Sequence, residues 1–137
     1  MTNKKHICVK DVMKSSYGTI DRNTTIMEAL DEMKRLQTTV LVVNKRDDQD
    51  EYGLLLVSDI ARKVLARDRS ANRVNSYEVM NKPAVCVSPD MDIRYCSRLM
   101  SSFNLVRVLV VKDGVLLGTV SPRALVLDGL MVIASDE

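Results

Sequence analysis

Two stretches of the sequence place polar side chains where an apolar strand is predicted to lead into a helix. The first stretch is Gly53–Asp59, and the second is Gly118–Ala124, sixty-five residues later. A strand followed by a helix N-terminus collects unpaired backbone N–H groups and the positive end of a helix dipole, which together bind anions. We therefore predict two related clefts, each suited to an anionic ligand.

Two arginines are candidate phosphate ligands in the second half of the chain. Arg123 lies at the start of a predicted helix, where its charge opposes the helix dipole, and a bound anion would relieve that conflict. Arg107 begins an otherwise apolar strand and, like Arg123, is a candidate phosphate ligand. The alternative for Arg123 is a solvated side chain.

The elements that must position these residues occur twice along the chain. Val12-Met13 returns as Val79-Met80, at an offset of 67 residues. Apolar residues spaced as one helix face run from Ile26 to Leu36 and again from Ile93 to Phe103. Thr25 and Glu28 form a predicted capping box, and Asp92 occupies the position of Thr25 in the second half.

Strands follow each predicted helix. Val40–Val43 and Val108–Val111 are apolar on both faces, which indicates buried strands. Asp113-Gly114 predicts a tight hairpin after the second of them. Each half therefore has the order extended segment, helix, strand, strand, helix. Neither half can bury both faces of its sheet alone, so we expect the two sheets to pack together.

Composition excludes several classes of function. The net charge of +2 is too small to indicate a nucleic-acid partner, and no apolar run reaches the roughly 18 residues of a membrane helix. Three unpatterned cysteines and the lack of a secretory signal are typical of a reducing cytoplasm. His6 and Cys8 give too few ligands for zinc. No catalytic set of side chains is evident, and we predict that the protein is not an enzyme.

The repeated pattern resembles a tandem pair of cystathionine-β-synthase (CBS) domains, known as a Bateman module. The resemblance covers about Val9 to Met131. It implies an α+β fold of two β-α-β-β-α repeats packed with pseudo-two-fold symmetry. We divide the chain into an N-terminal tail (1–8), repeat 1 (9–69), a linker (70–75), repeat 2 (76–132) and a C-terminal tail (133–137). The resemblance further implies a homodimer, formed through helices of both halves, and clefts that bind adenosine nucleotides.

The nucleotide-binding signature of this family is similar to Gly-apolar-X-Ser/Thr-X-X-Asp. In the family the Asp carboxylate accepts hydrogen bonds from both ribose hydroxyls, a task that suits an acceptor with two oxygens. The first repeat keeps Gly53 and Asp59 but has Leu56 at the hydroxyl position, and the second keeps Gly118 and Ser121 but has Ala124 at the Asp position.

Other residues of the clefts follow from the same resemblance. Thr19 and Ile20 would accompany Asp59, while Cys86 and Val87 would accompany Ser121. Strand packing is the favoured alternative for Ile20 and Val87. For Asp59 the alternative is a first-turn acid that the dipole stabilises by about 0.3–1 kcal/mol. Ser121 precedes Pro122, so a simple N-cap is its alternative.

We therefore predict a stand-alone regulatory module that binds AMP, ADP, ATP or S-adenosylmethionine in an inter-repeat cleft and signals to an effector protein in trans. The cleft with Asp59 is the preferred candidate, and no cofactor is required. The alternative is a ligand-free dimerisation or scaffold module whose nucleotide sites have degenerated.

Overall fold

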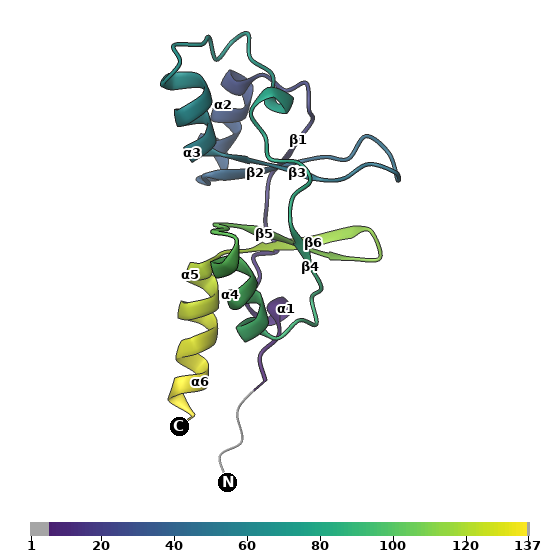
Figure 1. The fold of residues 1–137 in the computed structure, drawn as a ribbon, viewed down its shortest axis with the longest axis vertical. Coiled ribbons are helices and arrows are strands. Elements are labelled where there is room, and N and C mark those ends of the chain that lie inside the picture. The colour runs from purple at the N-terminus through teal and green to yellow at the C-terminus, as the bar shows by residue number, and fades with distance from the viewer. Residues whose placement is uncertain (1–5, 137) are drawn as a thin grey trace. The chain divides into compact units, whose positions relative to one another are not determined.

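Each half of the chain forms a three-stranded sheet with helices, as the computed structural model of residues 6–136 shows (Figure 1). The chain divides into two compact units, which do not coincide with the two sequence repeats. Unit A contains residues 17–84. Unit B contains the described residues up to Ser16 together with those from Val85 onward.

The sheet of unit A is built around a fully buried central strand. β2 (Val40–Val43) pairs in parallel with β1 (Thr19–Ile20) and antiparallel with β3 (Gly53–Leu56). All four side chains of β2 are buried, as predicted for a strand that is apolar on both faces. α3 (Val57–Ile60) follows β3 directly and continues as a π-helical turn over Ala61–Leu65.

α2 (Ile26–Leu36) connects the two parallel strands of unit A, and its ends agree with the sequence prediction. The Thr25 hydroxyl accepts a hydrogen bond from the Glu28 N–H at 3.1 Å, and the Glu28 carboxylate accepts one from the Thr25 N–H at 3.1 Å. This capping box satisfies two of the donors that a helix start leaves unpaired. Gln37 ends the helix in the left-handed conformation.

Unit B repeats this arrangement with a longer closing helix. β5 (Val108–Lys112) pairs in parallel with β4 (Cys86–Val87) and antiparallel with β6 (Val115–Val120). The turn between β5 and β6 has φ of 52° at Asp113 and 77° at Gly114. Positive φ at both positions is typical of the two-residue hairpin that Asp-Gly predicts, so that prediction is confirmed.

The helices of unit B surround one side of its core. α4 (Ile93–Ser102) begins at Asp92, whose carboxylate accepts a hydrogen bond from the Arg94 N–H at 2.7 Å. α5 (Pro122–Ala124), a π-helical stretch (Leu125–Leu130) and α6 (Met131–Ser135) follow one another without interruption. A Cβ at Gly129 would lie 2.5 Å from Ile93 Cδ1, so the last helix packs closely against α4 at this glycine and an alanine would require the Ile93 side chain to shift.

Each repeat contributes its first segment to the other unit. α1 (Val9–Val12) and Lys14 belong to unit B, where Lys14 and Thr119 exchange backbone hydrogen bonds of 2.8 and 3.0 Å. In unit A, Asn81 and Leu54 exchange the equivalent bonds, of 2.8 and 2.9 Å. The 3₁₀ turn Ser76–Glu78 lies just before Asn81, at the point where the first segment of repeat 2 crosses β3.

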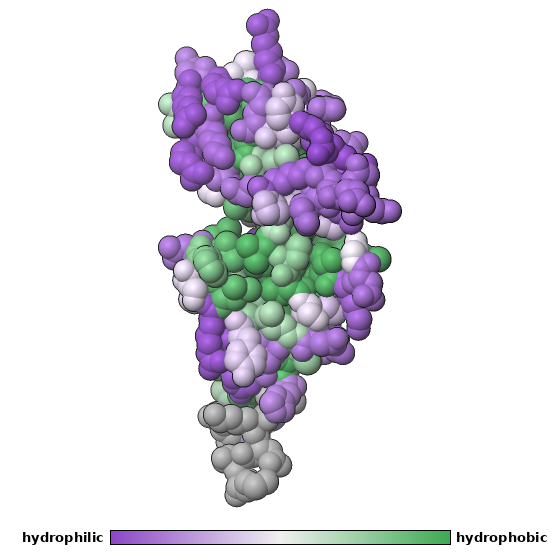
Figure 2. All heavy atoms as spheres, turned by 45° about the vertical axis from the view of Figure 1, so that its right-hand side comes forward, coloured by the Kyte–Doolittle hydropathy of each residue, from purple (hydrophilic) through white to green (hydrophobic). Residues whose placement is uncertain are grey.

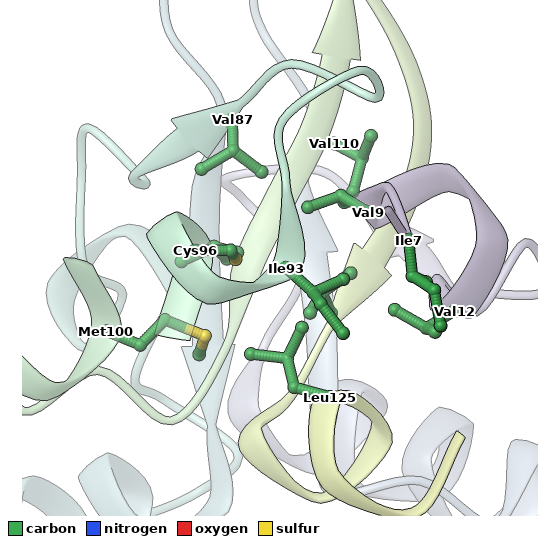
Figure 3. Close-up of a cluster of buried hydrophobic side chains, with 11 residues drawn as sticks. Ile7, Val9, Val12, Val87, Ile93, Cys96, Met100, Val110 and Leu125 are labelled. Carbon is green, nitrogen blue, oxygen red and sulfur yellow. The ribbon is translucent and has the colours of Figure 1, made fainter. Parts of the chain in front are cut away.

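Each unit has its own hydrophobic core. Figure 3 shows Ile7, Val9 and Val12 of the N-terminal segment lying against Ile93 and the sheet of unit B. The predicted N-terminal tail therefore includes a core residue, Ile7, while residues 1–5 lie outside the described part. In unit A the predicted linker contributes Val74, which is buried. Residues 133–135 of the predicted C-terminal tail belong to α6.

The α+β fold with two repeats of the predicted element order is confirmed. Among residues 6–136, no helix combines the length and the apolar character needed to cross a membrane.

Candidate functional site

A cleft of about 550 Å³ opens in unit B between the N-terminal segment, the start of β5 and the last helix. Its volume lies in the range of small-molecule sites. The lining residues are Val12, Met13, Lys14, Arg107, Thr119, Ser121, Arg123, Ala124, Leu127 and Asp128. The cleft therefore combines segments from both sequence repeats within one compact unit.

Arg107 is the most constrained cation of this cleft. It immediately precedes β5, is half-buried, and donates to the Thr119 hydroxyl over a long distance of 3.5 Å. Burial lowers the pKa of the Arg107 guanidinium, which nevertheless stays protonated. No carboxylate among residues 6–136 forms an ion pair with it. Arg107 thus brings an uncompensated positive charge into a partly desolvated site.

Arg123 and Lys14 add two exposed positive charges. Ser121 caps the last helix, and its hydroxyl accepts a hydrogen bond from the Ala124 N–H at 3.3 Å. Pro122 takes the first helical position, so Arg123 falls in the first turn. Lys14 reaches the cleft because its backbone pairs with Thr119. Asp128 is the one acidic residue among those that line the described cleft.

Gly118 makes the crossing of Lys14 over β6 sterically feasible. A Cβ at this position would lie 2.6 Å from the Lys14 carbonyl oxygen, closer than real Cβ contacts allow. The glycine that opens the signature in the second repeat therefore fixes how near the N-terminal segment comes to the cleft.

Asp59 in unit A lies in a different environment. Its side chain is 6% exposed, and its two oxygens accept hydrogen bonds from Arg62 at 2.7 Å and from the Asn81 amide at 2.6 Å. A buried carboxylate requires such donors because it is costly to desolvate without them. Both carboxylate oxygens of Asp59, the residue predicted to bind a ribose, thus already accept hydrogen bonds from groups of the same unit.

The structure brings three of the predicted site residues together, namely Arg107, Ser121 and Arg123. Thr19 is exposed on β1 in unit A, where the neighbouring Ile20 belongs to the hydrophobic core. Cys86 is exposed on β4, and Val87 is buried in the core of unit B. Neither residue of β4 lines the cleft of about 550 Å³.

Sequence reasoning did not single out Lys14 and Thr119 as cleft residues. The repeat contained the signal for Lys14, because Lys14 follows Val12-Met13 just as Asn81 follows Val79-Met80. Thr119 is the second residue of the Gly118 stretch, and its role depends on Arg107, which is distant in sequence. Within residues 6–136 no group of three or more His, Cys, Asp or Glu side chains could hold a metal ion.

A family model for the CBS domain matches residues 9–66 and 76–127. The chain belongs to the CBS domain family. It is 31% identical over 113 residues to the CBS domain-containing protein YhcV of Bacillus subtilis, covering 82% of this chain and 79% of that protein.

Solved structures of CBS proteins have the same fold. A hexameric CBS-CP12 protein from bloom-forming cyanobacteria superposes with a TM-score of 0.89 at 29% identity, covering 93% of this chain and 70% of that one. A CBS domain protein from Pyrobaculum aerophilum complexed with AMP superposes with a TM-score of 0.80 at 22% identity, covering 94% of this chain and 99% of that one. At that identity the second likeness concerns the fold alone.

Proposed function

We propose that this CBS pair is a regulatory module that binds an adenosine nucleotide in the cleft of unit B and signals to an effector protein in trans. The observation that carries the proposal is the half-buried Arg107, which has no acidic partner among the described residues and lines a cleft with Lys14 and Arg123. A bound phosphate would supply the missing counter-charge. The AMP complex of a protein with the same fold supports the choice of ligand class.

The cleft of unit B thereby replaces the cleft with Asp59 as the preferred site. In unit A the Asp59 carboxylate already accepts hydrogen bonds from Arg62 and Asn81, so a ribose would have to replace both donors. In unit B, Ser121 and Arg123 line the same cleft, and a cation beside the hydroxyl favours a ligand role for Ser121 over that of a simple N-cap. Thr19, Ile20, Cys86 and Val87 remain candidate contacts that the cleft of unit B does not require.

Thermal unfolding with AMP, ADP, ATP and S-adenosylmethionine tests the proposal. A ligand at one hundred times its dissociation constant stabilises the folded state by about 2.7 kcal/mol. For a chain of this length the midpoint should rise by roughly 10 °C. No shift with any of the four ligands would reject nucleotide binding. Loss of the shift in Arg107→Gln, with Asp59→Asn as the matched variant in unit A, would assign it to unit B.

A second candidate function is a ligand-free dimerisation module. The observation in its favour is the apolar surface of the last helix, where Val126, Leu127, Leu130 and Met131 are each 47–58% exposed. On the face drawn in Figure 2, apolar residues gather over unit B. Under this alternative the protein would self-associate, no nucleotide would shift its unfolding midpoint, and Arg107→Gln would leave its oligomeric state unchanged.

Homodimer formation is compatible with both candidates. A groove of about 300 Å³ between α4 and the last helix is lined by Ile93, Ser97, Leu125 and Leu130, among others. We propose that a second copy packs its own helices against this surface. The proposal includes no catalytic step and no required cofactor.

A further inference from the structure

The two units contain the same crossing but differ in the charges that surround it. Lys14 pairs with Thr119 in unit B exactly where Asn81 pairs with Leu54 in unit A, so Lys14 and Asn81 are structurally equivalent. By the offset of sixty-five residues, Ala124 is the equivalent of Asp59. The acidic and amide pair of unit A is therefore replaced by an alanine and a lysine in unit B.

This replacement changes which chemical group the cleft of unit B can hold. Without a carboxylate at position 124, the cleft lacks the acceptor that reads a ribose diol in this family. Three cationic side chains, Lys14, Arg107 and Arg123, face one carboxylate, Asp128, along the lining of the described cleft. The cleft thus has an excess of positive charge at the position where the family signature implies a ribose contact.

The contacts of these cations within the described residues leave their charges available to a ligand. Arg107 has only the 3.5 Å hydrogen bond to Thr119, at the upper limit of such contacts. Neither Lys14 nor Arg123 forms an ion pair with a described carboxylate. In unit A the situation is reversed, because Arg62 is paired with Asp59 at 2.7 Å.

We propose that the cleft of unit B recognises an oligophosphate chain, of two or more linked phosphates, and that the nucleoside contributes little to the affinity. This inference rests on the site assigned above and names its ligand class. Guanidinium groups bind phosphate oxygens through short, charge-assisted hydrogen bonds, often in pairs. Three cations separated along one cleft match several phosphates better than one. Uncharged adenosine and the sulfonium cation of S-adenosylmethionine lack the complementary charge.

Isothermal titration calorimetry at constant ionic strength tests the ligand class. Adenosine, AMP, ADP, ATP and inorganic triphosphate are titrated into the full chain. Affinity should rise from AMP to ATP by at least about tenfold, because each added charge-assisted hydrogen bond contributes about 1.5–3 kcal/mol, or roughly 10–150-fold. Inorganic triphosphate should bind within about tenfold of ATP. Equal affinity of adenosine, AMP and ATP would overturn the inference and leave nucleotide binding intact.

Substitutions locate the binding to the cleft. Arg107→Gln and Arg123→Gln should each weaken triphosphate binding by about tenfold or more. Arg67→Gln is the matched control, since Arg67 is an exposed arginine of unit A that does not line the cleft. Ala124→Asp restores the carboxylate of the family, and should weaken triphosphate binding and strengthen adenosine binding. Unfolding midpoints of the unliganded variants confirm that each is folded.

The two proposals fail in different ways. Binding of inorganic triphosphate and ATP with equal strength, both sensitive to Arg107→Gln, supports the oligophosphate site. Binding of inorganic triphosphate without binding of ATP would overturn both, because the inference requires the two to bind within about tenfold of each other. Binding of ATP that Arg107→Gln and Arg123→Gln leave unchanged would overturn the inference and place the nucleotide elsewhere. No binding of any of the five compounds would overturn both.

Discussion

At the scale of single residues, the unpaired charge of Arg107 destabilises the folded protein unless an anion is bound beside it. Its guanidinium is half-buried, and it forms no ion pair with a described carboxylate. A charge that is partly removed from water without a counter-charge destabilises the folded state, and an apolar side chain of similar length removes that penalty. We therefore predict that Arg107→Met raises the stability of the unliganded protein by about 1 kcal/mol, measured by urea unfolding. A fall in stability would show that Arg107 has a structural role.

Asp59 has the opposite character, because its hydrogen bonds make it part of the fold. Asp59→Ala removes the acceptor for Arg62 and Asn81 and leaves the Asn81 amide without its partner at 2.6 Å. We predict a loss of about 1–3 kcal/mol in the free energy of unfolding. The same urea unfolding measures this loss. Asp59→Asn, which keeps an oxygen acceptor, should lose less, and equal losses would contradict the assigned role.

At the scale of elements, the two glycines that open the closing strands differ in how closely they are packed. A Cβ at Gly118 would meet the Lys14 carbonyl oxygen at 2.6 Å, a backbone atom that cannot move away alone. A Cβ at Gly53 would meet the corresponding Asn81 oxygen at 3.4 Å and the flexible Met80 sulfur at 2.9 Å.

We accordingly predict that Gly118→Ala destabilises the protein by about 1–3 kcal/mol and weakens ligand binding, because it displaces Lys14 from the cleft. Gly53→Ala is its matched control in unit A and should cost less. Thermal unfolding and triphosphate titration of both variants test this. The expectation fails if Gly53→Ala is the more damaging change.

The elements themselves were predictable from local patterns. The apolar period and the capping box define α2, and Asp-Gly defines the β5–β6 turn, because each depends on neighbours within a few residues. Local patterns could not predict that Lys14 pairs with Thr119 or that Asn81 pairs with Leu54, since the two residues of each pair lie far apart in sequence. The sequence identified Arg107 and Arg123 as cations. It could not show that the Asn81 amide donates a hydrogen bond to Asp59, because that contact joins residues 22 positions apart.

At the scale of the whole molecule, several carboxylates couple folding to pH. Hydrogen bonds from Lys82 and from the Arg46 N–H lower the pKa of Asp50 well below its usual range. The Asn75 N–H and Arg69 lower the pKa of Glu78, and Lys10 and Lys112 lower that of Asp90. Because these pKa values are lower in the folded state, the carboxylates stabilise it above about pH 4, and this contribution is lost as the pH falls further.

We predict that the free energy of unfolding decreases from about pH 5 to pH 2.5 and that Asp50→Asn makes this decrease less steep. The ion pair with Lys82 at 2.7 Å forms only when Asp50 is ionised, so the variant lacks one of the groups that must be protonated. Urea unfolding at several pH values measures the slope. An unchanged slope in Asp50→Asn would assign the acid sensitivity to other carboxylates.

Self-association is the last property that the exposed surface predicts. Leu130 is 53% exposed beside the groove between α4 and the last helix, and burying such side chains is the main source of association free energy. For a chain of 15.4 kDa, we predict about twice that mass by light scattering and close to the single-chain mass for Leu130→Glu. Val115→Glu, on the β5–β6 hairpin and 58% exposed, is the matched control and should remain dimeric. If both variants keep the mass of the original protein, the last helix is not the interface. If Leu130→Glu is monomeric and still binds triphosphate, each chain contains a complete ligand site and association is not needed for ligand binding.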